Sequence, residues 1–117
     1  MSVWEEQLTG DIWLVGVSGR LDQSQTTDLE ECLQKLLNEG CNRLVIDLSE
    51  VTYVNSGGLR CLVTIWRQAR DHGGNVVLCN LSDRISQVFA IVGFDKVFAI
   101  YSSRVEALEN LVGDQAS

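Results

Sequence analysis

The stretch DLSEVTYVNSGGL, from Asp47 to Leu59, decides how this chain is organised. It follows the apolar run 44–46, which predicts a buried strand ending at Asp47. A helical pattern begins at Gly58, so Ser56 stands just before a helix N-terminus. The first backbone N–H groups of a helix have no partner inside it. The Ser56 hydroxyl can therefore cap the helix or, if phosphorylated, place a phosphate where N–H donors point.

Strand and helix patterns alternate before this stretch. Two strand-like runs, 3–8 and 12–17, flank a turn-like trio at 9–11 and predict a hairpin. The segment Ser18–Asp22 predicts a loop. Apolar residues at helical spacing then predict a helix whose start Ser24 or Thr26 can cap and which stops at Gly40; they are Leu29, Cys32, Leu33, Leu36 and Leu37.

The same alternation continues after the central strand, 43–47. The helix from Gly58 ends at 72–74, and a strand at 75–79 follows. Ser82 caps a third helix that Gly93 closes, Lys96–Tyr101 predicts a last strand, and a final helix begins at Ser103. The order ββαβαβαβα predicts one α/β domain with a mixed, mostly parallel sheet of about five strands and about four helices.

Composition and charge argue against several classes of function. The 117 residues carry 16 acidic and 9 basic side chains, a formal net charge of −7. This balance argues against a nucleic-acid partner and against attraction to an anionic membrane surface. No apolar run approaches the roughly 18–20 residues of a membrane span, and no secretory signal is visible. The four cysteines lack metal-ligand spacing, which favours reduced thiols in a cytoplasmic protein.

No catalytic motif is present in the sequence. The surroundings of Ser56 do not form GxSxG, and phosphate-binding glycine loops are absent. His72 stands 16 residues beyond Ser56 on the same predicted helix, roughly 24 Å away at a rise of 1.5 Å per residue. A serine–histidine couple within the chain is therefore excluded. We expect no enzyme activity, no cofactor and no metal site.

Three predicted loops follow the carboxyl ends of strands, where ligands and partners of α/β sheets usually bind. They are 19–22, 55–58 and 80–82, and we expect them to gather, with Asp22 near Ser56. The predicted partner-binding residues on these loops are Asp22, Asn55, Ser56, Gly57, Gly58, Asn80 and Ser82.

The stretch Asp47–Leu59 resembles the signature of bacterial anti-sigma-factor antagonists, the STAS domain family. Ser18–Asp22 is similar to the second, shorter motif of that family: a small residue, Gly, any residue, Leu or Ile, then Asp. Order and spacing of the elements match over roughly residues 3–112. The resemblance implies a single STAS domain over residues 1–117, in the cytoplasm, with helices packed largely on one side of the sheet.

The resemblance also implies partner switching. In this family the unphosphorylated form binds an anti-sigma factor that is also a serine kinase, which frees the sigma factor. Phosphorylation of a serine in the signature by that kinase breaks the complex, and a PP2C-type phosphatase resets it. Ser56 matches that serine, so we expect it to be the phosphorylation site. Phosphorylation should change affinity rather than fold, because phosphate is tolerated at a helix N-terminus.

Two positions depart from the family pattern. Asn55 stands where Asp is usual, and Gly57 stands where Ser, Thr or Ala is usual. Asn keeps hydrogen-bonding capacity but lacks the negative charge. A kinase that needs this carboxylate would phosphorylate Ser56 slowly.

Other functions remain open at this point. A STAS subunit that is not phosphorylated and serves an ABC-type membrane transport complex fits Asn55 and the glycine pair equally well. A scaffold component of a larger sensory assembly is a third alternative. The sequence leaves the oligomeric state open, including a homo-oligomer.

Overall fold

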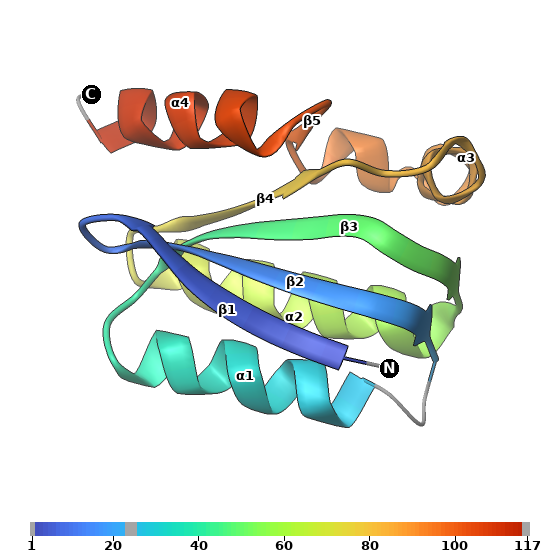
Figure 1. Cartoon of the computed structure of the whole chain (residues 1–117), viewed down its shortest axis with the longest axis horizontal. Coiled ribbons are helices and arrows are strands. Elements are labelled where there is room, and N and C mark those ends of the chain that lie inside the picture. The colour runs from blue at the N-terminus through green and yellow to red at the C-terminus, as the bar shows by residue number, and fades with distance from the viewer. Residues whose placement is uncertain (1, 23–25, 116–117) are drawn as a thin grey trace.

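A computed structural model describes residues 2–22 and 26–115, so the predicted cap Ser24 lies outside the described residues. It contains five strands, four α-helices and one short 3₁₀ helix in the predicted order (Figure 1). Their bounds are β1 Ser2–Thr9, β2 Ile12–Leu21, α1 Thr26–Asn38, β3 Arg43–Val54, α2 Ser56–Asp71, β4 Asn75–Cys79, α3 Asp83–Ile91, η1 Phe94–Lys96, β5 Ile100–Tyr101 and α4 Arg104–Gln115.

The strands form one sheet in the order β1-β2-β3-β4-β5. β1 pairs with β2 antiparallel, and the remaining neighbours are parallel, so the predicted mixed sheet is confirmed. The predicted hairpin turn lies between Thr9 and Ile12, which pair with each other. Gly10 adopts φ 54° there, a left-handed conformation that glycine enters without steric cost.

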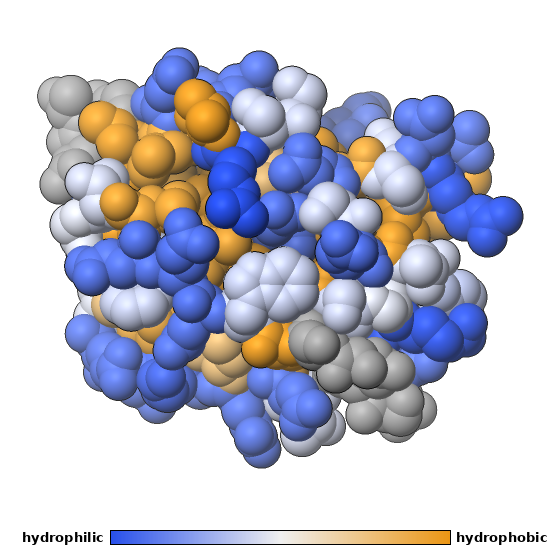
Figure 2. All heavy atoms as spheres, in the orientation of Figure 1, coloured by the Kyte–Doolittle hydropathy of each residue, from blue (hydrophilic) through white to orange (hydrophobic). Residues whose placement is uncertain are grey.

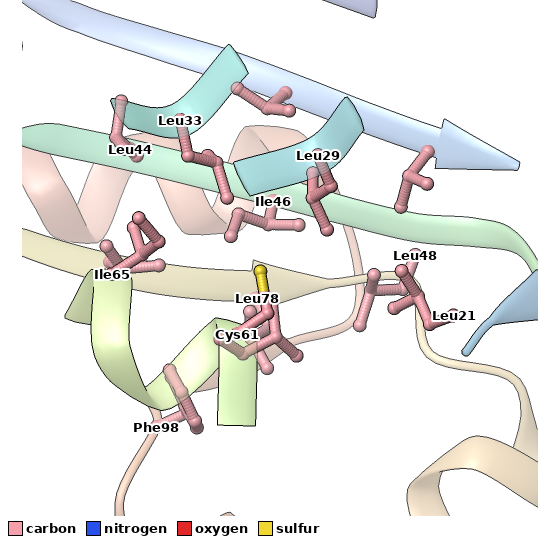
Figure 3. Close-up of a cluster of buried hydrophobic side chains, with 14 of the residues drawn as sticks. Leu21, Leu29, Leu33, Leu44, Ile46, Leu48, Cys61, Ile65, Leu78 and Phe98 are labelled. Carbon is pink, nitrogen blue, oxygen red and sulfur yellow. The ribbon is translucent and has the colours of Figure 1, made fainter. Parts of the chain in front are cut away.

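Helices cover both faces of the sheet, unequally. α1 and α2 lie under one face and α4 lies over the other (Figure 1). The larger core fills the α1–α2 side, where side chains from both helices meet those of β3 and β4 (Figure 3). The smaller core joins Ala107 and Leu111 of α4 to the opposite face of β2, β3 and β4. Burying both faces explains why β2 is nearly all apolar.

β3 is longer than the sequence predicts. The predicted strand ends at Asp47, whereas β3 continues to Val54, and β2 reaches Leu21 through the predicted loop 18–22. Two bulges in β3 account for the error: Gly16 and Ser18 pair with Asp47 and Glu50, and Gly19 and Arg20 pair with Val51 and Tyr53. Each bulge adds one residue to β3 and breaks the alternation that identifies a strand.

The predicted last strand, 96–101, is also wrong in its extent. Only Ile100 and Tyr101 form β5, and η1 precedes them. Phe98 is buried in the connecting segment, with its ring centroid 6.0 Å from that of Trp66 and 5.9 Å from that of Phe94. Phe98 is the one buried residue of this run, and its aromatic packing from a loop replaces a strand ladder there.

Two ion pairs involve residues of β3. The Arg43 side chain is 10% exposed, contacts the Asp11 carboxylate and donates to the Leu111 carbonyl oxygen at 3.2 Å. Hydrogen bonding from Arg43 lowers the pKa of Asp11. Arg104 of α4 lies 3.4 Å from a carboxylate oxygen of the buried Asp47. The Arg43 hydrogen bond to Leu111 and the Arg104–Asp47 pair connect the C-terminal helix to the sheet, and the Arg43–Asp11 pair connects β3 to the hairpin turn.

The outer side of α4 retains some apolar surface. Val105 and Val112 are exposed on this helix. Figure 2 shows hydrophobic spheres in its upper left part, where Figure 1 places α4. Within the described ranges, no helix combines the length and the apolar character needed to cross a membrane.

Candidate functional site

The turn from β3 into α2 is closed by Asn55. Its side-chain oxygen accepts hydrogen bonds from the backbone N–H of Gly57 at 3.0 Å and of Gly58 at 3.3 Å. Its backbone is extended, with φ −123° and ψ −173°, and its carbonyl oxygen accepts from the Leu59 N–H at 3.0 Å. Asn55 is therefore the N-cap of α2.

Ser56 is the first residue of α2 and is exposed. Of the two roles that the sequence leaves open for its hydroxyl, capping of α2 is excluded, because Asn55 is the cap. Asn55 also occupies the N–H groups of Gly57 and Gly58, which the sequence analysis left free for a phosphate. The Ser56 hydroxyl makes no hydrogen bond to any residue in the described ranges, so it is available to a partner or a modifying enzyme.

Gly58 allows α2 to start against the end of β2. A Cβ atom on Gly58 would lie 2.6 Å from the Leu21 carbonyl oxygen and 2.9 Å from the Leu21 Cβ. The same end of β2 binds the turn directly, since the Asn55 N–H donates to the Leu21 carbonyl oxygen at 3.1 Å. Only glycine fits at this approach. This close contact between Gly58 and Leu21 fixes the position of Ser56 relative to the end of β2.

A hollow of about 520 Å³ lies beside Ser56, between the N-terminal ends of α1 and α2. Both helices begin at the same end of the molecule, where β2 and β3 finish (Figure 1, right). The lining is mostly polar and carries one acidic and one basic side chain. Its residues are Thr26, Thr27, Glu30, Asn55, Ser56, Gly57 and Arg60.

Charged and aromatic side chains lie beside this hollow at the end of β2. Asp22 follows β2 and pairs with Arg20, whose Nε lies 3.2 Å from the Asp22 carboxylate. The Arg20 guanidinium carbon also lies 4.0 Å from the ring centre of Tyr53 on β3. Leu21 pairs with Val54, so Asp22 and Asn55 follow adjacent strands at the same level. This confirms that Asp22 lies close to the Ser56 turn.

Asn80 and Ser82 lie elsewhere. β4 ends level with Asp47, while β3 runs on to Val54; five residues of β2 span that distance, roughly 15 Å along the strands. Asn80 and Ser82 line a separate hollow, together with Ser49. The expectation that all three loops gather is wrong, because the β3 extension carries the Ser56 turn away.

Both outlying residues have structural partners. Asn80 has a left-handed backbone, φ 60°, and its amide donates to a carboxylate oxygen of Asp47 at 3.4 Å. The Ser82 hydroxyl accepts from the Ile85 N–H at 3.3 Å and caps α3, as predicted. These contacts account for both residue types without a ligand.

Four residues that line the Ser56 hollow were not predicted from the sequence: Thr26, Thr27, Glu30 and Arg60. Arg60 could have been found, because it is four residues beyond Ser56 on a predicted helix and such residues share a face. Glu30 could not have been found in this way, because it reaches the hollow only through the packing of α1 against α2.

Glu30 also affects a buried thiol nearby. Burial, and next the charge of Glu30, raise the pKa of the Cys61 thiol to about 12.

Comparison with known proteins identifies the family. The model of the STAS domain matches residues 4–107. BtrV of Bordetella bronchiseptica, a candidate anti-sigma factor antagonist, is 33% identical over 91 residues, covering 78% of each chain. The anti-sigma-B factor antagonist of Bacillus subtilis is 33% identical over 86 residues, covering 74% of this chain and 78% of its own.

Solved structures share the fold. The Bacillus cell fate determinant SpoIIAA in its phosphorylated form superposes with a TM-score of 0.75 at 16% identity, covering 93% of this chain and 98% of its own. At that identity the likeness concerns the fold alone. The helix order, the mixed sheet, the match over residues 4–107 and the identity to named relatives agree, and the chain belongs to the STAS domain family.

Proposed function

We propose that this chain is an anti-sigma factor antagonist that works by partner switching in the cytoplasm. The observation that carries the proposal is the state of Ser56: exposed, first in α2, and released from capping by Asn55. Relatives named as anti-sigma factor antagonists support the same function. The unphosphorylated chain binds an anti-sigma factor with serine-kinase activity, and this releases the sigma factor.

Phosphorylation of Ser56 ends that complex. The kinase transfers the γ-phosphoryl group of ATP to the Ser56 oxygen, and ADP and the hydroxyl proton leave. The phosphate adds a charge of about −1.5 to −2 on an exposed surface that includes Glu30 and Asp22. A partner surface matched to a neutral hydroxyl would lose affinity through repulsion and desolvation. A PP2C-type phosphatase restores the hydroxyl by hydrolysis.

The docking surface comprises Asp22, Asn55, Ser56 and Gly57, whereas the predicted residue Gly58 is buried against Leu21 and only supports the turn. These residues lie on one end of the sheet, beside the hollow between α1 and α2. Asn80 and Ser82 would join the interface only if the partner also covers the second hollow. The net charge of −7 favours a partner with a basic docking face.

Charge reversal of the switch residue tests this function. Serine-kinase ATPases from the same genome are purified, and their affinity for the chain is measured by surface plasmon resonance. Ser56→Ala should retain binding, and Ser56→Asp should weaken it at least about tenfold. Asn110→Asp supplies the control, because it adds one negative charge on exposed α4, over the opposite face of the sheet.

Two results would contradict the proposal. One is equal affinity of the Ser56→Asp and Asn110→Asp variants for every kinase that binds the wild-type chain. The other is the absence of phosphate on Ser56, by intact mass, after incubation with a bound kinase and ATP. Co-purification with an ABC-type ATPase instead would favour the transport-accessory alternative.

A further inference from the structure

Arg60 and Ser56 share one wall of the α1–α2 hollow. Arg60 follows Ser56 by four residues on α2, and both line the hollow. Side chains at this spacing lie about 5–6 Å apart at Cβ, within reach of a long arginine side chain. Arg60 is exposed and forms no ion pair with any residue in 2–22 or 26–115. Its guanidinium is therefore uncommitted in the unphosphorylated chain.

The N-terminus of α2 offers a phosphate few donors. Asn55 accepts from the N–H groups of Gly57 and Gly58, and the Leu59 N–H bonds to the Asn55 carbonyl oxygen. Two of the donors that usually hold an anion at a helix start, the N–H groups of Gly57 and Gly58, are thus already occupied. A side-chain donor would therefore add hydrogen bonds that most of the helix backbone here does not offer to a phosphate on Ser56.

We propose that Arg60 is the intramolecular ligand of a phosphate carried by Ser56, an inference that rests on the proposed function because it takes Ser56 as the modified residue. The guanidinium presents several N–H donors in a plane that matches phosphate oxygens. Phosphorylation then changes two charges of the docking surface. It adds the phosphate, and it withdraws the Arg60 cation from contact with a partner.

The other charged groups in and beside the hollow determine how strongly Arg60 is attracted to the phosphate. Glu30 faces it from α1 and opposes the phosphate. Asp22, from the end of β2, is neutralised by Arg20 at 3.2 Å. Asn55 is neutral where a carboxylate would add further repulsion. Among these charged side chains, Arg60 is therefore the cation that is free to bind the phosphate.

The test measures the pKa of a phosphate carried by residue 56, because a nearby arginine lowers that pKa. Phosphoserine is installed at position 56 by genetic encoding, so the experiment requires no kinase. Its second pKa, ordinarily about 6, is measured by ³¹P NMR titration in about 0.1 M salt. Arg60→Gln should raise this pKa by roughly half a pH unit, and Arg60→Lys should leave most of the lowering intact because the charge remains.

Arg67→Gln is the matched control. Arg67 is an exposed arginine of α2, 11 residues beyond Ser56, roughly 16 Å along the helix and beyond the screening length of about 10 Å. It should leave the phosphate pKa unchanged. An unchanged pKa in Arg60→Gln, or an equal change in Arg67→Gln, would overturn the inference. Either result would leave the partner-binding test standing, because that test measures the affinity of the unmodified chain and of Ser56→Asp.

Discussion

Removing the Asn55 side chain should destabilise the protein through the N-terminus of α2. The Asn55 side-chain oxygen accepts two backbone N–H groups, at 3.0 and 3.3 Å, that have no partner within the helix. Loss of such a cap costs about 1 kcal/mol. Asn55→Ala should therefore lower the free energy of unfolding by about 1 kcal/mol in urea denaturation followed by circular dichroism.

Asn55→Asp should act in the opposite direction. The first turn of α2 carries no acidic residue, so a carboxylate here meets the positive end of the helix dipole without competition. That interaction is worth about 0.3–1 kcal/mol near neutral pH. The gain should disappear below about pH 3, because the carboxylate is then protonated. The aspartate and alanine variants should thus differ by roughly 1.5 kcal/mol at pH 7.

Asn110→Asp is the control for this series, because it makes the same chemical change in the middle of α4, away from a helix start. It should shift the free energy of unfolding by less than about 0.5 kcal/mol. Asn55→Ala as stable as the wild type would refute the assignment of Asn55 as the cap. An equal gain in both aspartate variants would refute the dipole argument.

Three other changes test the packing and the charges around the sheet. Gly58→Ala should lower stability by roughly 1–2 kcal/mol in urea, because its Cβ would meet Leu21 at 2.6–2.9 Å and overpacking outweighs the helix gain of about 1 kcal/mol; a more stable variant would contradict this. Arg43 lowers the pKa of Asp11, so the pair stabilises above the unfolded pKa of about 3.9 and loses this as pH falls through the lowered folded value. The difference in unfolding free energy between wild type and Asp11→Asn should therefore shrink from pH 6 to pH 3, and a constant difference would count against the pair. The buried Cys61 thiol, with its pKa raised to about 12, should react with Ellman's reagent at pH 8 only as fast as the domain opens, and rapid labelling would disprove its burial.

The order of the elements could be predicted from the sequence because the helices have clear boundaries and faces. Gly40 and residues 72–74 end α1 and α2, and Ser82 caps α3 as its residue type suggests. These signals act over a few residues and depend little on the rest of the fold. The resemblance of the stretch 47–59 to a family signature pointed to Ser56, which is the first residue of α2 and is exposed.

The length of β3 could not be predicted, because its bulges depend on pairing with β2. Leu48, Val51 and Val54 are buried at a spacing of three, which matches neither a strand nor a helix. The role of Asn55 was also missed, since Asn and Ser are both good caps and only the backbone geometry distinguishes them. Glu30 reaches the site through helix packing, which no local pattern records.

The outer part of β3 also affects how the site moves. Beyond Asp47 it pairs with β2 alone among the described strands. A two-stranded ribbon has little stability of its own. Amide hydrogen exchange along residues 48–54 should therefore be faster than along 43–47, on the time scale of local opening rather than global unfolding. We expect the Ser56 turn, at the tip of this ribbon, to open more readily than the five-stranded centre of the sheet.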